Sequence, residues 1–104
     1  MENTLNKYKV LLYPKAYRDL EEIYSYIVNE ILEPDIAKKQ IERIWDALNS
    51  LSVFPHSHQD RLVGRFANKG YKQFVVDNFL IIYRIDEEIK EVYVVTIQYV
   101  KRNI

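Results

Sequence analysis

The side chains of this sequence that are best suited to chemistry are cations that follow apolar stretches. Lys101 and Arg102 come after one apolar stretch near the C-terminus, and Arg84 comes directly after another, Phe79–Tyr83. Residues at the end of a strand have fixed positions in the fold. We therefore expect the functional site to lie at these cations. A guanidinium group such as that of Arg84 forks onto phosphate oxygens. Pairing of Arg84 with a nearby Asp86 or Glu88 is the alternative.

A second group of cations precedes these stretches. Residues 61–72 contain no Asp or Glu, although the formal net charge of the chain is zero. The four cations of this basic segment are Arg61, Arg65, Lys69 and Lys72. Clustered cations predict a surface that contacts phosphate groups or an acidic partner; a solvated loop is the alternative. The zero net charge argues against strong unaided binding to nucleic acid, because that binding needs many phosphate contacts.

The sequence gives little support for a metal site, for cysteine-based redox chemistry or for a membrane-spanning segment. His56 and His58 are two residues apart, but a histidine pair without a third ligand is weak evidence, so we expect no metal and no cofactor. The sequence has no cysteine, which excludes disulfides, thiolate nucleophiles and zinc–cysteine sites and is compatible with a reducing cytosol. Since no leader-like or membrane-spanning apolar run is present, we expect a cytoplasmic protein with no membrane partner.

The first half of the sequence predicts a strand followed by two helices. Residues 8–13 are apolar except for Lys9 and predict a short strand. Pro14 follows them and suits the first turn of a helix. Apolar side chains then recur at three- and four-residue steps in two groups separated by Pro34, which predicts an antiparallel helical hairpin, and Pro55 is expected to end the second helix. The two groups are Ala16, Leu20, Ile23, Ile27 and Ile31, and Ala37, Ile41, Ile44, Leu48 and Leu51.

Four aromatic residues accompany this hairpin: Tyr17, Tyr24, Tyr26 and Trp45. They are expected to cover the edges of the core stripe. Base stacking, or the lining of a partner groove, is the alternative.

The last third predicts three strands in an antiparallel meander. Asp77-Asn78 and Asp86–Glu88 are turn sequences between apolar runs. Phe79–Tyr83 is apolar throughout, which is typical of a central strand covered on both faces. Strict alternation places Tyr93, Val95, Ile97 and Tyr99 on one face of the last strand, and Val92, Val94, Thr96 and Gln98 on the other. With 104 residues, 48% of them hydrophobic, residues 1–104 are expected to form a single domain.

This ordered set, with DNFLIIYRID and VVTIQYVKRNI at its end, resembles the RelE/ParE superfamily of bacterial toxins from about Tyr8 to Ile104. The resemblance implies an α+β fold in which an N-terminal strand, an antiparallel helical hairpin and a three-stranded antiparallel meander form one sheet with the hairpin packed on it. It also implies the toxin component of a type II toxin-antitoxin system, neutralised by a cognate antitoxin protein that wraps it.

Two activities occur in that superfamily. RelE-like members cleave ribosome-bound mRNA without a metal, using the 2′-hydroxyl of the substrate, and ParE-like members poison DNA gyrase without cutting anything themselves. By resemblance, Arg102 stands where RelE-like enzymes carry a catalytic arginine, and Lys72 lies near their basic residues. The favoured hypothesis is a ribosome-dependent mRNA endoribonuclease with Lys72, Arg84, Tyr99 and Arg102 around the scissile phosphate. A gyrase inhibitor and an inactive antitoxin-binding relative are the alternatives.

The sequence departs from the ribonuclease pattern in three places. Leu80 stands where those enzymes have an arginine, Tyr99 stands where many carry a histidine, and no aromatic residue follows Arg102. A phenol with its ordinary pKa of about 10 is a poor base, and Tyr99 is alternatively a tyrosine at the edge of the core. If Lys72, Arg84 and Arg102 lie close enough to contact one phosphate, the ribonuclease hypothesis is favoured. If they lie on different faces of the sheet, that hypothesis is weakened. The remaining cations, Arg61, Arg65, Lys69 and Lys101, are assigned to nucleic-acid or antitoxin contact.

Overall fold

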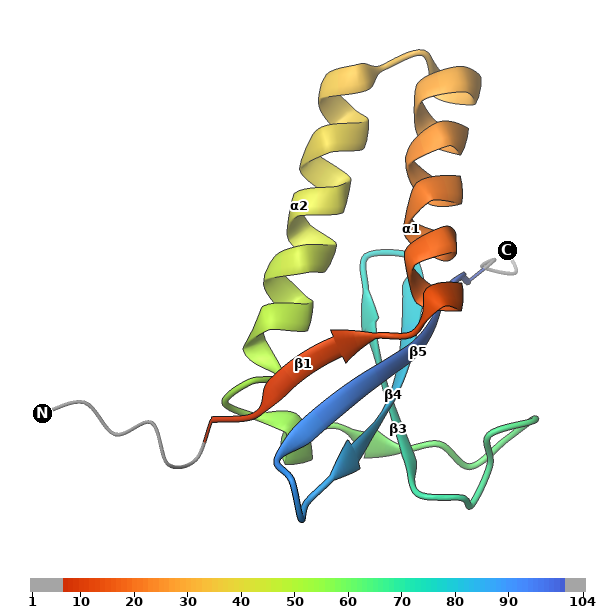
Figure 1. Cartoon of the computed structure of the whole chain (residues 1–104). Helices are drawn as coiled ribbons and strands as arrows, with labels where there is room; N and C mark the ends of the chain where they lie inside the picture. The colour runs from red at the N-terminus through yellow and green to blue at the C-terminus, as the bar shows by residue number, and fades with distance from the viewer. Residues whose placement is uncertain (1–6, 101–104) are drawn as a thin grey trace, which may run out of the picture.

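The structure, a computed structural model, describes residues 7–100. A helical hairpin packs on one face of a five-stranded sheet with the order β1-β5-β4-β3-β2, and the far end of the hairpin projects beyond the sheet (Figure 1). In chain order the elements are β1 (Lys9–Leu12), α1 (Pro14–Tyr26), a π-helical turn (Ile27–Ile31), α2 (Pro34–Ser50), a 3₁₀ turn (Pro55–Ser57), β2 (Gln59–Asp60), β3 (Tyr71–Val76), β4 (Phe79–Asp86) and β5 (Glu91–Tyr99). The predicted α+β fold is confirmed.

The helices form where the apolar periodicity predicts them. Pro14 and Pro34 each occupy the first turn of a helix, where the missing N–H costs nothing. Most side chains of the two apolar stripes are buried: Ala16, Leu20, Ile23 and Ile27 of the first, and Ala37, Ile44, Leu48 and Leu51 of the second. Among the described residues, no helix is both long enough and apolar enough to cross a membrane.

The prediction that Pro55 ends the second helix is wrong, because α2 already stops at Ser50. The amides of Leu51, Ser52 and Val53 turn back onto carbonyls three residues earlier, which tightens the last turn. The carbonyl of Ser52 then accepts a hydrogen bond from the N–H of Tyr8 at 2.8 Å. The end of α2 is therefore tied to the start of β1.

β4 is the central strand, as predicted, and Phe79–Tyr83 is buried at every position. The hairpins around Asp77-Asn78 and residues 87–90 join β3, β4 and β5 into the expected antiparallel meander. β1, however, pairs with β5 in parallel, with Lys9 opposite Glu91 and Leu12 opposite Val94. The sheet is therefore mixed, not antiparallel throughout. The short strand β2 extends the other edge of the sheet.

A β-bulge in β5 overturns the predicted alternation of its side chains. Ile82 lies opposite Thr96 and Tyr83 opposite Val94, so Val95 has no partner on β4. The extra residue reverses the face of everything after it. Ile97 consequently shares the helix-covered face with Val94, which strict alternation had placed on the opposite side, and both are buried in the core.

Asp19 of α1 closes the edge of β5 just beyond the last β1 pair. Its Oδ2 accepts hydrogen bonds from the N–H of Ile97 at 2.9 Å and the hydroxyl of Thr96 at 2.8 Å, and its Oδ1 accepts one from Lys15. β1 stops pairing at Val94, so these groups would otherwise lack a partner. A buried carboxylate thus replaces the missing strand.

Candidate functional site

Lys72 lies on β3 opposite Tyr83, on the sheet face that the helices cover. Its ammonium donates to Asp60 Oδ1 at 2.9 Å and to the His58 carbonyl at 3.2 Å. The side chain is mostly buried, and its charge is matched by a carboxylate. Lys72 therefore holds β2 and the segment before it onto β3.

Arg84 lies on β4 between Tyr71 of β3 and Tyr93 of β5, at the opposite face of the sheet. We call it the uncovered face because the helices do not cover it, although Leu80 and Ile82 on it are buried. Its guanidinium stacks on the Tyr93 ring at 4.4 Å and donates from Nε and Nη2 to the hydroxyl of Tyr13 at 3.3 and 3.1 Å. The hydrogen bond to Tyr13 raises the pKa of Arg84. Neither Asp86 nor Glu88 pairs with it within the part of the chain that the structure describes.

Tyr99 lies at the other end of the sheet. It is paired with Phe79, its ring packs on the Phe79 ring at 5.7 Å, and 64% of the residue is exposed. Phe79 and Arg84 are five residues apart on β4, about 17 Å along a strand. Lys101 and Arg102 fall outside the described residues.

The structure thus does not bring the described members of the predicted catalytic group together. Lys72 and Arg84 occupy opposite faces of the sheet, and Tyr99 lies at the far end of β4. A phosphate held by Arg84 on the uncovered face is out of reach of the Lys72 amine, because the sheet separates them.

The uncovered face instead gathers cations and aromatic rings, which we call the open-face cluster. Its members are Tyr13, Arg61, Arg65, Phe66, Tyr71, Arg84 and Tyr93. Phe66 packs on Tyr71 at 4.8 Å, and the Arg65 guanidinium lies 5.6 Å from the Phe66 ring. Arginine planes between aromatic rings suit a planar or anionic ligand.

Arg61 anchors the basic segment to this face. Its Nη1 donates to Gln73 Oε1 at 2.6 Å, and Gln73 lies opposite Ile82, on the same face as Arg84. The Nε of Arg61 is buried and has no hydrogen-bond partner among the described residues. Gly64, with a φ of +76°, allows the turn that brings the segment back over Arg61. Arg65 and Lys69 remain exposed.

The aromatic members of this cluster were missed by sequence reasoning. A two-residue turn at Asp77-Asn78 places Tyr71 opposite Arg84 by counting alone, and this signal was available. The contact of Tyr13 with Arg84 was not, because it depends on the parallel entry of β1 beside β5.

Neither histidine belongs to the open-face cluster. His58 stacks on Phe74 at 4.2 Å, on the helix-covered side, and burial together with the charge of Lys72 lowers its pKa. His56 contacts Glu87 Oε1 at 2.8 Å. Across residues 7–100, no group of three or more His, Asp or Glu side chains is arranged to hold a metal. The cluster can therefore bind an anion through arginine, but it contains no imidazole to act as a base.

Glu87 is the centre of a separate surface network. It accepts hydrogen bonds from the Tyr8 hydroxyl at 2.6 Å and from Lys90 at 2.6 Å, in addition to its contact with His56. Lys90, Tyr8 and His56 together lower the pKa of Glu87 from 4.5 to about 2. This network joins the start of β1 to the β4–β5 turn.

The network predicts a pH-dependent loss of stability in Glu87→Gln. A carboxylate with a lowered folded-state pKa stabilises the protein above pH 4.5, and this contribution disappears as the pH falls towards about 2. Urea unfolding is measured at pH 7, 5, 4 and 3. The midpoint of the wild type should exceed that of the variant at pH 7 and 5, and the difference between the two midpoints should become smaller at pH 4 and 3. Glu88→Gln, at an exposed neighbour, should match wild type; an equal effect of both variants would contradict the prediction.

One family model matches most of the chain. Residues 10–104 match the family described as the ParE toxin of type II toxin-antitoxin system, parDE. The comparison with curated proteins gives no match.

Three solved structures have a similar fold. A chain of the chromosomal ParDE toxin-antitoxin system from P. aeruginosa has a TM-score of 0.76 at 20% identity, with 92% of this chain and 99% of that chain covered. The RelBE2 toxin-antitoxin complex from Mycobacterium tuberculosis has a TM-score of 0.63 at 22% identity, covering 94% and 97%. The archaeal RelE–RelB complex from Pyrococcus horikoshii OT3 has a TM-score of 0.63 at 14% identity, covering 93% and 99%.

Proposed function

Because the chain belongs to the ParE toxin family of type II toxin-antitoxin systems, we propose that it is a toxin that inhibits DNA gyrase by binding and does not itself cut RNA. The observation that carries this proposal is the separation of Lys72 from Arg84 by the thickness of the sheet. Cleavage through a 2′-hydroxyl needs a base, an acid and cations at one phosphate. Lys72 is neutralised by Asp60, and Arg84 is held by tyrosine side chains.

The partner that the family implies is a cognate antitoxin. We propose that it covers the basic segment, where Arg65 and Lys69 are exposed and no acid interrupts residues 61–72. An acidic segment of an antitoxin would find exposed cations there. Because Arg65 and Lys69 would then serve both antitoxin binding and toxicity, substitutions of these two residues are poor tests of toxicity.

Ribosome-dependent mRNA cleavage is the second candidate. Arginine and aromatic rings gather on the open face, an arrangement that suits unpaired bases, and two of the similar folds are those of RelBE and RelE–RelB complexes. Under this candidate Arg102, together with Arg84, would serve the scissile phosphate.

Controlled expression in bacteria separates the two candidates. We expect growth arrest with intact reporter transcripts by primer extension, and loss of supercoiling when the purified toxin is added to gyrase. Lys72→Ala should keep the arrest, because its amine already pairs with Asp60. Codon-phased cuts that disappear in Arg102→Ala would instead establish the ribonuclease. Absence of any arrest would indicate an inactive, antitoxin-binding relative.

A further inference from the structure

The loop that follows β2, residues 61–70, is closed by its own backbone. The N–H of Arg61 donates to the Tyr71 carbonyl at 2.8 Å, and the N–H of Asn68 donates to the Arg61 carbonyl at 2.9 Å. Gly70, with a φ of +85°, then turns the chain into β3. The loop leaves the sheet edge opposite β1 and projects beyond the strands (Figure 1). A loop closed in this way presents its side chains at defined positions.

This loop exposes two aliphatic side chains next to its cations. Leu62 is 67% and Val63 is 61% exposed, so packing of the core does not explain them. Arg65 and Lys69 of the same loop are exposed as well. Proteins that bind the minor groove of DNA use this combination, because an aliphatic side chain enters between base pairs while cations contact the adjacent phosphates.

The open-face cluster continues this surface onto the sheet. Phe66 of the loop packs on Tyr71 at 4.8 Å, and Tyr71 lies opposite Arg84. The charged side chains of the loop and of the strands on this face are Lys9, Arg61, Arg65, Lys69, Arg84, Asp86 and Glu91. Five of these seven are cations, so the combined surface attracts an anionic partner.

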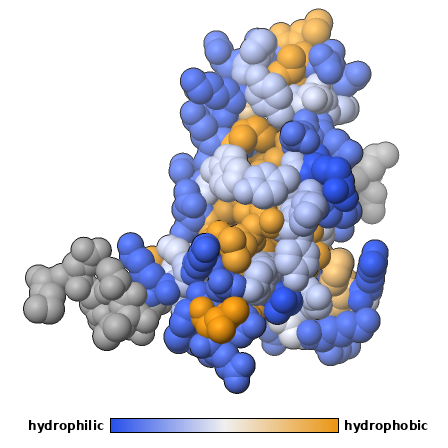
Figure 2. Space-filling view, viewed as in Figure 1, coloured by the Kyte–Doolittle hydropathy of each residue, from blue (hydrophilic) through white to orange (hydrophobic). Residues whose placement is uncertain are grey.

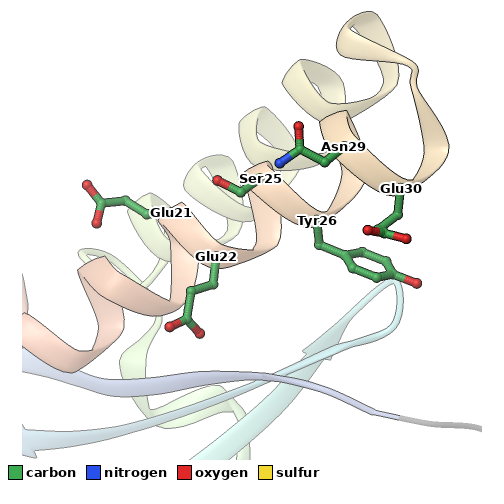
Figure 3. A pocket seen from close by; sticks show the side chains of 6 residues that line it. All are labelled: Glu21, Glu22, Ser25, Tyr26, Asn29 and Glu30. Atoms are coloured by element: carbon green, nitrogen blue, oxygen red, sulfur yellow. The ribbon is translucent and has the colours of Figure 1, made fainter.

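The helical hairpin on the other face of the sheet has the opposite charge. Residues 14–50, which contain both helices, hold five Lys or Arg against eight Asp or Glu, which leaves −3. Figure 3 shows Glu22 and Glu30 projecting on the same side of α1. The surface between the helices is apolar in Figure 2, and Tyr17 and Trp45 line a hollow there. An anionic polymer is therefore directed to the loop and the open face, away from the hairpin.

We propose that the loop contacts the DNA that gyrase holds, with Leu62 and Val63 between base pairs in the minor groove and Arg65 and Lys69 on neighbouring phosphates. The inference rests on the proposed function, because a chain of zero net charge does not bind DNA strongly by itself. On gyrase the loop is already held beside the DNA, so a few contacts act at a high local concentration.

An anionic membrane is the other surface that cations and aliphatic side chains contact. Stable attachment to lipid needs a longer amphipathic face or a lipid anchor, and Leu62 and Val63 supply only two aliphatic side chains. The aromatic rings beside the loop also suit bases, which stack on them. The observations therefore favour DNA.

Binding of the full-length toxin to purified gyrase, with and without a bound DNA duplex, tests the proposal. DNA should tighten the binding of wild type by about tenfold. The double variant Leu62→Ser, Val63→Ser should lose this gain, whereas its affinity for DNA-free gyrase should not change. The control Leu32→Ser, Ile36→Ser removes two exposed aliphatic side chains from the hairpin and should keep the gain.

The salt dependence of binding tests the cations. With DNA present, Arg65→Gln should reduce the slope of log affinity against log salt concentration by about 1. Lys38→Gln removes an exposed cation from α2 and should leave the slope unchanged. Arg65 can be tested in this assay because the purified system contains no antitoxin.

A photocrosslinking amino acid in place of Val63 identifies what the loop touches. We expect a cross-link to DNA in the gyrase complex. A cross-link to gyrase alone, or toxin binding that is equal with and without DNA, would overturn the proposal. Binding to phosphatidylglycerol vesicles by wild type, but not by Leu62→Ser, Val63→Ser, would make a membrane the occupant instead. A toxin that does not bind gyrase under either condition would overturn the proposed function as well, so the two failures are distinguishable.

Discussion

Replacing Tyr83 with alanine is expected to destabilise the protein by about 3–5 kcal/mol. Tyr83 is 0% exposed at the centre of β4. Its ring packs against Phe74 at 5.9 Å and against His58 at 6.2 Å, and its hydroxyl donates to the Pro55 carbonyl at 2.5 Å. Burial raises the pKa of this phenol, so it stays protonated and keeps donating. A loss of this size approaches the whole stability of a small domain.

Tyr83→Phe separates the ring from the hydroxyl. It keeps the packing but leaves the Pro55 carbonyl without its donor, which should cost about 1–2 kcal/mol. Urea unfolding at pH 7, followed by circular dichroism, gives both values. If Tyr83→Phe destabilises the protein as much as Tyr83→Ala does, the hydrogen bond contributes more stability than the packing of the ring, and the argument from packing is wrong.

Asp19→Ala is expected to cost about 2–4 kcal/mol, because it leaves two buried donors without an acceptor. These are the N–H of Ile97 and the hydroxyl of Thr96, beside the bulge of β5. The loss should also appear as faster amide exchange at Ile97, because the described part of β1 stops pairing at Val94 and does not reach it. Thermal unfolding and hydrogen exchange measured on the same samples check the two consequences.

Lys15→Ala is the matched control for Asp19. Lys15 donates to the same carboxylate at 2.7 Å, but its side chain is 57% exposed, so its removal should cost at most about 1 kcal/mol. If Lys15→Ala destabilises as much as Asp19→Ala, the ion pair stabilises the strand edge and the capping role is wrong. Asp19→Asn should fall between them, because its amide oxygen still accepts.

Both contacts act on the elements that carry the functional surfaces. Tyr83 holds the segment after α2 onto the sheet, next to the pair formed by Lys72 and Asp60. Asp19 holds β5 just before Tyr99. Variants at Tyr83 or Asp19 that lose toxicity would therefore reflect unfolding, and they are unsuitable as tests of the target.

Local patterns in the sequence determined the elements and most of the core. Three- and four-residue apolar steps predicted both helices, and the continuous apolar run Phe79–Tyr83 predicted the central strand. The turn at Asp77-Asn78 set the register of β3 on β4, and the position of Arg84 near the end of the central strand followed from the apolar run that precedes it. These features rest on neighbours in the chain, which is why they can be read without the fold.

Only the tertiary structure decided how the candidate residues lie relative to one another. The sequence predicted three cations, Lys72, Arg84 and Arg102, at one phosphate, but sheet pairing put Lys72 and Arg84 on opposite faces. The bulge at Val95 reversed the face of the end of β5, and the parallel entry of β1 brought Tyr13 onto Arg84. Such contacts join residues up to about eighty positions apart, as in Asp19 with Ile97. Their geometry depends on strand order and on a single inserted residue, neither of which leaves a periodic signal in the sequence.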